Sequence, residues 1–134
     1  MELQWTKALS IGIDEIDNQH KELFIRINNL LDTMGQKKEI EEVGRVFGFL
    51  EDYVKTHFNT EEGYMSRYNY PEYQSHRAQH REFIKDFSLF KEKFEREPPS
   101  GFLVIQFGNM LVEWWINHIR KVDKSLGAFL NTKL

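Results

Sequence analysis

The 134-residue sequence contains no cysteine, which excludes disulfide bonds, iron–sulfur clusters and thiolate zinc sites. It also lacks a basic excess: 18 lysines and arginines stand against 21 acidic residues, so nucleic acid is not an expected partner. No apolar run approaches the ~20 residues that a membrane helix needs, and the N-terminus MELQWTK has no apolar segment of signal-peptide type. These absences predict a soluble, cytoplasmic protein without a membrane segment.

Proline and glycine are also scarce, with three prolines and eight glycines, and they mark where helices can end. Breaks are expected after Gly35, at the N-Y-P segment of residues 69–71 and at the P-P-S-G segment of residues 98–101. The helices that these breaks predict span about 15–35, 39–67, 71–96 and 101–120.

Local signals refine these boundaries. The first helix is expected to begin after Asp14, the third to carry Pro71 in its first turn, and the fourth to have Ser100 as its N-cap. A short turn, residues 123–130, is expected to close the chain.

Apolar residues are abundant, at 40% of the sequence with eleven phenylalanines, and they recur at helical spacing. The four stripes comprise Ile16, His20, Leu23, Ile27, Leu30 and Met34; Val43, Phe47, Leu50, Val54, His57, Glu61 and Tyr64; Tyr73, His76, His80, Phe83, Phe87, Phe90 and Phe94; and Val104, Gly108, Leu111, Trp115, His118 and Val122. Short connections favour antiparallel neighbours. The sequence therefore predicts an all-α, up-down-up-down four-helix bundle, with residues 1–134 as a single domain.

Polar residues interrupt these stripes at matching places, and they include all five histidines: His20, His57, Glu61, His76, His80 and His118. A single histidine at such a position is usually a core imidazole with a backbone partner, and any one pair is a weak signal. In an antiparallel bundle, however, the starts of odd helices and the ends of even helices share one end. Since six unpaired polar groups at one level of the core would be costly, the pattern predicts a metal site near that end.

The number and type of these groups bear on the metal. Six exceed the four ligands that zinc uses, and imidazole-rich sets favour iron, copper or zinc over magnesium or calcium. Two octahedral iron ions would offer twelve positions; five imidazoles fill five, two bridging carboxylates four and one shared oxygen atom two, which leaves one position open. Glu61 would supply one carboxylate, and Asp123 the other.

The spacing of His118 and Asp123 needs an explanation, because five residues turn an α-helix by about 500° and leave the two side chains about 140° apart. The fourth helix is therefore expected to end between them. The chain would then bend so that Asp123 re-enters the site, with Gly127 in the redirecting segment.

Four segments together resemble the hemerythrin family, in particular its single-domain bacterial type, over nearly the whole chain. They are IGIDEIDNQH at 11–20, HFNTEEGYM at 57–65, YPEYQSHRAQH at 70–80 and WWINHIRKVD at 114–123. The resemblance implies two iron ions per chain, bridged by an oxo or hydroxo group and two carboxylates. The implied ligands are His76, His80 and His118 on one iron, His20 and His57 on the other, and Glu61 and Asp123 as bridges.

The resemblance also implies reversible O2 binding at the two-histidine iron, where O2 takes up one electron from each Fe(II) and is held as hydroperoxide, and binding of exogenous anions such as azide. Hemerythrins usually have leucine three residues before the last histidine ligand, where this chain has Trp115. Trp115 is expected to narrow the pocket or to change how well the bound oxygen is shielded; the alternative is that it only fills core volume. The predicted O2 pocket comprises Phe24, Trp114, Trp115 and Ile119.

Two other functions remain open: a di-iron enzyme or stress protein, with peroxidase-like activity or nitric oxide handling, and a sensor of O2 or iron. Ferritin-like oxidases use a Glu-x-x-His motif, and no histidine here follows a glutamate by three residues. Sensors of the family are usually fused to signalling domains and iron-repair relatives carry cysteines, neither of which this sequence shows. The sequence favours an O2 carrier, store or buffer that is not an enzyme.

Overall fold

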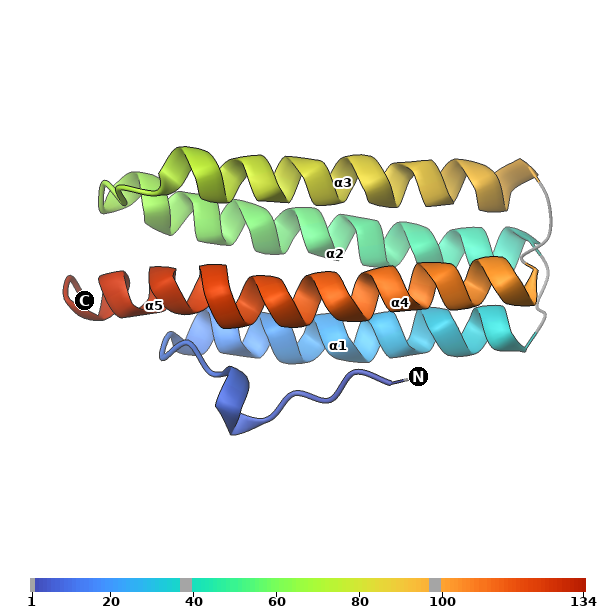
Figure 1. Ribbon diagram of the computed structural model, residues 1–134, viewed down its shortest axis with the longest axis horizontal. Helices are drawn as coiled ribbons and strands as arrows, with labels where there is room; N and C mark the ends of the chain where they lie inside the picture. The colour runs from blue at the N-terminus through green and yellow to red at the C-terminus, as the bar shows by residue number, and fades with distance from the viewer. Residues whose placement is uncertain (1, 37–39, 97–99) are drawn as a thin grey trace.

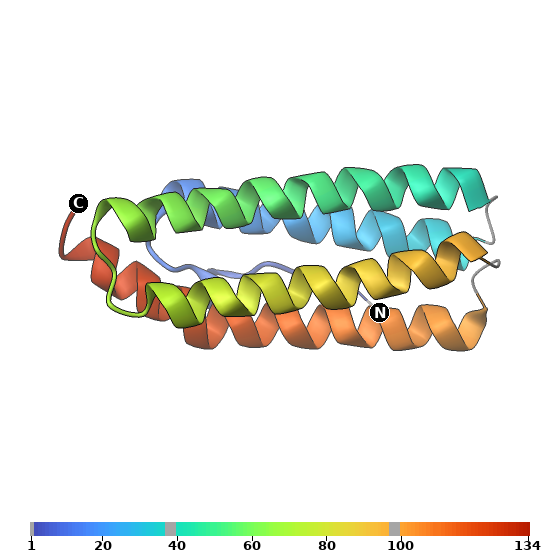
Figure 2. The ribbon, with the colours of Figure 1, turned by 90° about the horizontal axis from the view of Figure 1, so that it is seen from above.

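Four long helices form an antiparallel bundle in the computed structural model, which describes residues 2–36, 40–96 and 100–134 (Figure 1). Consecutive helices run in opposite directions, as the view from above also shows (Figure 2). The helices are α1 (Asp14–Gly35), α2 (Ile40–Arg67), α3 (Tyr73–Arg96) and α4 (Gly101–Asn117), and the described residues contain no strand. The predicted all-α, up-down-up-down bundle is confirmed.

Two of the predicted helix starts agree with the structure. The hydroxyl oxygen of Ser100 accepts a hydrogen bond from the backbone N–H of Leu103 at 3.1 Å, so Ser100 is the N-cap of α4. Helix α1 begins at Asp14, one residue earlier than expected, and its acidic first turn lies at the positive end of the helix dipole. The predicted boundary residues Glu39, Pro98 and Pro99 lie outside the described residues.

The prediction that Pro71 lies in the first turn of α3 is wrong, because α3 begins only at Tyr73. The chain leaves α2 through Asn69, whose φ of 56° is a left-handed conformation that asparagine adopts more readily than most residues. The N–H of Tyr73 then donates to the carbonyl oxygen of Tyr70 at 3.2 Å. Pro71 therefore belongs to the turn that precedes the helix.

The expected end of the fourth helix near Arg120, with a bend before Asp123, is also wrong. Helix α4 passes directly into a π-helical turn, η2 (His118–Asp123), and then into α5 (Lys124–Asn131), all running in the same direction (Figure 1). The segment expected as a closing turn is thus helical. Gly127 does not redirect the chain; a Cβ at this position would overlap the backbone oxygen of Ile11, so glycine lets α5 pack against the segment before α1.

The core has two chemically different ends. Phenylalanines fill the end at which α1 finishes and α2 begins; the ring centroid of Phe47 lies 4.4 Å from that of Phe87 and 5.4 Å from that of Phe107. Most residues of the predicted stripes are buried, and the half-buried exceptions are Tyr64, Tyr73, Phe90, Val104 and Val122. Among the described residues, no helix is long and apolar enough to cross a membrane.

Candidate metal centre

Seven polar side chains converge in the core at the end of the bundle opposite the phenylalanines. They come from α1 (His20), α2 (His57 and Glu61), α3 (His76 and His80) and η2 (His118 and Asp123). Each is at most 3% exposed, and Glu61 and Asp123 are fully buried. The structure thus brings together every residue that the sequence proposes as a metal ligand.

These side chains form two overlapping groups, within each of which the candidate ligand atoms lie within 4.8 Å of one another. One group comprises Glu61, His76, His80, His118 and Asp123, and the other comprises His20, His57, Glu61 and Asp123. Each group could hold one metal ion. Because Glu61 and Asp123 belong to both, the two positions would share their carboxylates.

The two oxygens of Glu61 face different groups. Its Oε1 lies 3.2 Å from Nε2 of His76 and 3.0 Å from Nε2 of His80. Its Oε2 lies 3.2 Å from Nε2 of His57. This is the orientation that a carboxylate needs in order to bridge two metal ions.

Asp123 is oriented in the same way. Its Oδ1 lies 3.1 Å from Nε2 of both His76 and His118, and its Oδ2 lies 3.0 Å from Nε2 of His20. The π-helical turn makes this position available, because a turn whose hydrogen bonds reach five residues back brings residues five apart to one side of the helix. The helix therefore does not need to end between His118 and Asp123.

Several inward-facing atoms lack a partner that is aligned for a hydrogen bond. His20 Nε2 and Asp123 Oδ2 are 3.0 Å apart, yet neither has such a partner among the described residues, and the same holds for Nε2 of His57. Leaving such buried groups unpaired costs about 1–3 kcal/mol each. Nitrogen and oxygen atoms that converge in this way are available to a metal ion once the imidazoles are neutral, and a set of imidazoles and carboxylates fits iron among the metals that favour imidazole.

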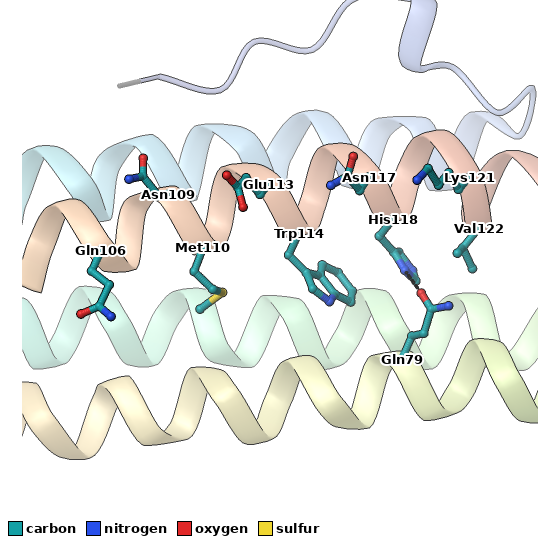
Figure 3. Close-up of a pocket in the computed structure, with 10 residues that line it drawn as sticks. All are labelled: Gln79, Gln106, Asn109, Met110, Glu113, Trp114, Asn117, His118, Lys121 and Val122. Carbon is teal, nitrogen blue, oxygen red and sulfur yellow. Dashed lines mark hydrogen bonds between the residues drawn. The ribbon is translucent and has the colours of Figure 1, made fainter.

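The outer nitrogens of three imidazoles do have partners. Nδ1 of His57 lies 2.7 Å from Oε1 of Gln19, and Nδ1 of His118 lies 3.0 Å from Oε1 of Gln79 (Figure 3). An acceptor at Nδ1 fixes the tautomer in which Nδ1–H donates and the Nε2 lone pair faces the centre. The third partner carries a charge: Oε2 of Glu62 lies 2.9 Å from Nδ1 of His80.

The site also shifts the pKa values of its own groups. Burial opposes the charged form of His20, but the carboxylates of Asp123 and Glu61 outweigh it and raise the pKa of His20 to about 9. The same balance raises the pKa of His76 to about 9. At His57 burial dominates and lowers the pKa. Without metal, the carboxylates therefore hold protons on imidazoles that a metal ion would have to displace.

The carboxylates show the complementary effect. Burial opposes their ionisation, but the imidazole of His57 and its neighbours hold the pKa of Glu61 well below its usual range. Burial and the charge of Glu61 also oppose ionisation of Asp123, yet contacts with His118 and His20 lower its pKa. Both carboxylates are thus ionised and able to act as ligands.

Of the predicted O2-pocket residues, the two tryptophans pack against imidazoles of the cluster. Trp115 is fully buried, with its ring centroid 5.9 Å from that of His57 and 6.5 Å from that of His20. Phe24 and Ile119 are buried as well. Trp114 instead stacks on His118 at 4.3 Å and lines a groove of about 610 Å³ that also includes Gln79 and Met110 (Figure 3). Their role in ligand binding stays a prediction.

Sequence reasoning missed the partners of the imidazoles, Gln19, Gln79 and Glu62. A signal for the two glutamines exists, because each directly precedes a site histidine in the chain, in the Gln-His pairs at 19–20 and 79–80. The residue before a core-facing position points about 100° around the helix, toward a neighbouring helix. Each glutamine accordingly contacts an imidazole of the next helix.

The antiparallel bundle and the buried histidine–carboxylate cluster define a helical-bundle protein with a metal-binding site in its core. Residues 11–130 match the hemerythrin HHE cation binding domain, and the chain belongs to the hemerythrin family.

Similar proteins agree with this assignment. The chain is 32% identical to a bacteriohemerythrin of Methylococcus capsulatus over 131 residues, which cover 96% of this chain and 97% of that protein. It is 35% identical to a bacteriohemerythrin of Pseudomonas aeruginosa over 121 residues, which cover 90% of this chain and 76% of that protein. The crystal structure of a wild-type hemerythrin superimposes with a TM-score of 0.83 at 29% identity, covering 94% of this chain and 95% of that one.

Proposed function

We propose that the seven-residue cluster binds two iron ions per chain and that the protein binds O2 reversibly, as a carrier, store or buffer. The observation that carries this proposal is the orientation of Glu61 and Asp123, each of which presents one oxygen to the three-histidine group and the other to the two-histidine group. An oxo or hydroxo group would complete the bridge. The bacteriohemerythrins to which the chain is similar support the same proposal.

The unequal distribution of imidazoles gives the two positions different roles. His76, His80 and His118 would hold one iron with no position to spare, whereas His20 and His57 would hold the other and leave one position for an exogenous ligand. A pair of ferrous ions, when bound, supplies the two electrons that O2 takes up. The protein contributes preset imidazole tautomers and a buried, largely apolar wall beside His20 and His57, which keeps water away from the open position.

The ligand set favours binding over turnover. Ferritin-like di-iron proteins place a glutamate from each of four helices in the site, and this cluster has only two carboxylates against five imidazoles. We therefore propose that the protein is not an enzyme. Binding of azide, a cytoplasmic location and residues 1–134 as one domain belong to the same proposal.

Anaerobic reconstitution with Fe(II) tests the proposal. We expect elemental analysis to give two irons per chain, and a visible spectrum that appears with O2 and disappears when O2 is removed under argon, over repeated cycles. A His57→Gln variant should lose the O2-dependent spectrum, and Gln74→Leu, on an exposed part of α3, should keep it. One iron per chain would contradict the di-iron centre, and a spectrum that decays with consumption of a reductant would favour the enzyme.

A further inference from the structure

The indole of Trp115 carries a buried hydrogen-bond donor without an acceptor. The side chain is fully buried, and Nε1 has no hydrogen-bond partner in the part of the chain that the structure describes. An indole nitrogen can only donate, and a buried tryptophan N–H normally finds an acceptor. An unpaired donor in the core costs free energy. Beside a binding site, a ligand with a hydrogen-bond acceptor would remove this cost.

The neighbours of the ring explain why no acceptor is available within the protein. Three of them are apolar or aromatic rings, Phe58, Phe83 and Trp114, with centroids 5.6, 5.3 and 5.0 Å from that of Trp115. The ring also packs against His57, His20 and His118, with centroids 5.9, 6.5 and 6.5 Å away, and the Nε2 atoms of all three face the carboxylates. The ring therefore forms part of the wall of the metal centre, and its nearest imidazole is that of His57 in the two-histidine group, where the proposed open position would be.

Trp5 provides a comparison within the same chain. Its Nε1 likewise has no partner among the described residues, but its ring is only partly buried and lies under the ammonium group of Lys21, at 4.4 Å from the ring centroid. Trp5 packs against Lys21, an exposed residue of α1, rather than against the imidazoles of the cluster, so its unpaired N–H is a reference for one outside the site. Trp115 is fully buried against imidazoles of the cluster, so a ligand that enters the metal centre could be the acceptor for its N–H.

We propose that the N–H of Trp115 donates a hydrogen bond to an anionic ligand held beside His20 and His57, and that it thereby favours ligands with an acceptor atom. This inference rests on the proposed di-iron centre, since the ligand needs an open metal position to occupy. A leucine at this position would offer only volume. A hydrogen bond to a charged group corresponds to about tenfold or more in affinity.

The test must remove the N–H and keep the ring. Site-specific replacement of Trp115 by 3-benzothienylalanine does so, because sulfur takes the place of the N–H group in a ring of nearly the same shape. The same replacement at Trp5 is the matched control, since it removes an unpaired N–H from a ring that packs against Lys21 rather than against the site imidazoles. Both proteins are loaded with iron, oxidised and titrated with azide, and binding is followed by visible absorption; iron per chain and the thermal midpoint are measured alongside.

We expect azide to bind about tenfold more weakly to the protein altered at Trp115, and within twofold of the unaltered protein after replacement at Trp5. A second readout is specific for the hydrogen bond: the iron–azide vibration of the unaltered protein should shift between H2O and D2O, and this shift should vanish with the analogue at Trp115. Trp115→Phe, which also lacks the N–H, should lose the shift as well.

Iron content separates the proposed di-iron centre from the proposed hydrogen bond of Trp115. Two irons per chain with unchanged azide affinity, and no shift in D2O, would overturn the role of Trp115 and leave the di-iron centre standing. Fewer than two irons in the unaltered protein would overturn the di-iron proposal and this inference with it.

Discussion

The amide oxygen of Gln19 lies 2.7 Å from Nδ1 of His57, and the amide nitrogen of the same side chain donates to the hydroxyl of Thr60 at 3.1 Å. The contact with Thr60 fixes which end of the amide faces the imidazole. The imidazole is thereby held with its proton on Nδ1 and its lone pair on Nε2. Gln19 on α1 thus sets the tautomer of His57, a candidate metal ligand on α2.

Replacing Gln19 by leucine removes this acceptor and leaves the Nδ1–H of His57 unpaired. We expect Gln19→Leu to lower the affinity for iron about tenfold, because partners of ligating histidines typically contribute a factor of 10 to 100. Competition with a chromogenic chelator measures the effect. Gln74→Leu, at an exposed position of α3, is the control and should behave like the unaltered protein; equal affinities for both variants would remove Gln19 from the proposed site.

Deleting Arg120 tests the π-helical turn. Arg120 is exposed, and its loss would place His118 and Asp123 four residues apart, which is the spacing of His57 and Glu61 in the α-helical α2. An ordinary α-helical turn could then keep both side chains on one side, so we expect iron binding at two per chain to survive. Iron analysis after reconstitution measures this.

The control deletion removes Asn109, an exposed residue of α4 before the site. It rotates His118 and Asp123 together by about 100° relative to the start of α4, and we expect it to abolish iron binding. If the two deletion variants bind equally little iron, then the role of η2 is not to accommodate the extra residue between His118 and Asp123.

The metal-free protein should lose stability as the pH rises above neutrality. In the folded chain the pKa values of His20 and His76 are raised to about 9, whereas the unfolded chain titrates near 6.5. Between these two pH values the folded state therefore binds more protons than the unfolded state. The contribution of these protons to the free energy of unfolding is complete below pH 6.5 and is lost as the pH rises past 9. Urea unfolding of metal-free protein from pH 6 to 9.5 should show a falling free energy of unfolding.

Iron should reverse this trend. Binding requires neutral imidazoles, so iron displaces the protons of His20 and His76, and the stabilisation that it provides should grow over the same pH range. His57, whose pKa burial lowers, disfavours the folded state only at acidic pH and does not alter the direction above 6.5. Metal-free stability that is constant from pH 6.5 to 9 would show that the two imidazoles carry no extra protons.

Gly127→Ala should destabilise the protein. The added Cβ would overlap the backbone oxygen of Ile11, so either α5 or the segment before α1 has to move, at a cost of about 1–3 kcal/mol. Gly63→Ala is the matched control; nothing lies within 4 Å of a Cβ at this exposed position of α2, and alanine should add about 0.5–1 kcal/mol of helix stability. Chemical unfolding of both variants should show opposite signs.

The sequence predicts the bundle and the convergence of the polar residues because helical periodicity and the alternation of helix direction are both encoded in residue spacing. His20, His57 and Glu61 could be placed at one end for this reason alone. The π-helical turn could not be predicted, because its pattern of backbone hydrogen bonds has no side-chain signature. The spacing of His118 and Asp123 signals an irregularity, and a bend accounts for it as well as a wider turn does.

Helix α5 and the partners of the imidazoles were missed for different reasons. Leu126, Phe129 and Leu130 have helical spacing, but Gly127 among them also fits a segment that redirects the chain, and its close approach to Ile11 is a tertiary contact that the sequence does not show. The contact of Gln79 with His118 depends on how far one helix is rotated relative to the next. Such rotations result from packing of the whole bundle and are not contained in the spacing of one segment.

The two glutamine–histidine pairs reveal an internal repeat. The α1–α2 hairpin presents Gln19 to His57, which is followed by Glu61; the α3–α4 hairpin presents Gln79 to His118, which is followed by Asp123. The two halves differ in two places. His57 and Glu61 are four residues apart, whereas His118 and Asp123 are five apart; and Ile16 stands four residues before His20, whereas His76 stands four residues before His80. If the site holds the two proposed irons, a histidine at both of these places would saturate both positions. The open position of the proposed centre would then follow from the second difference alone, since Ile16 stands where the other half has His76.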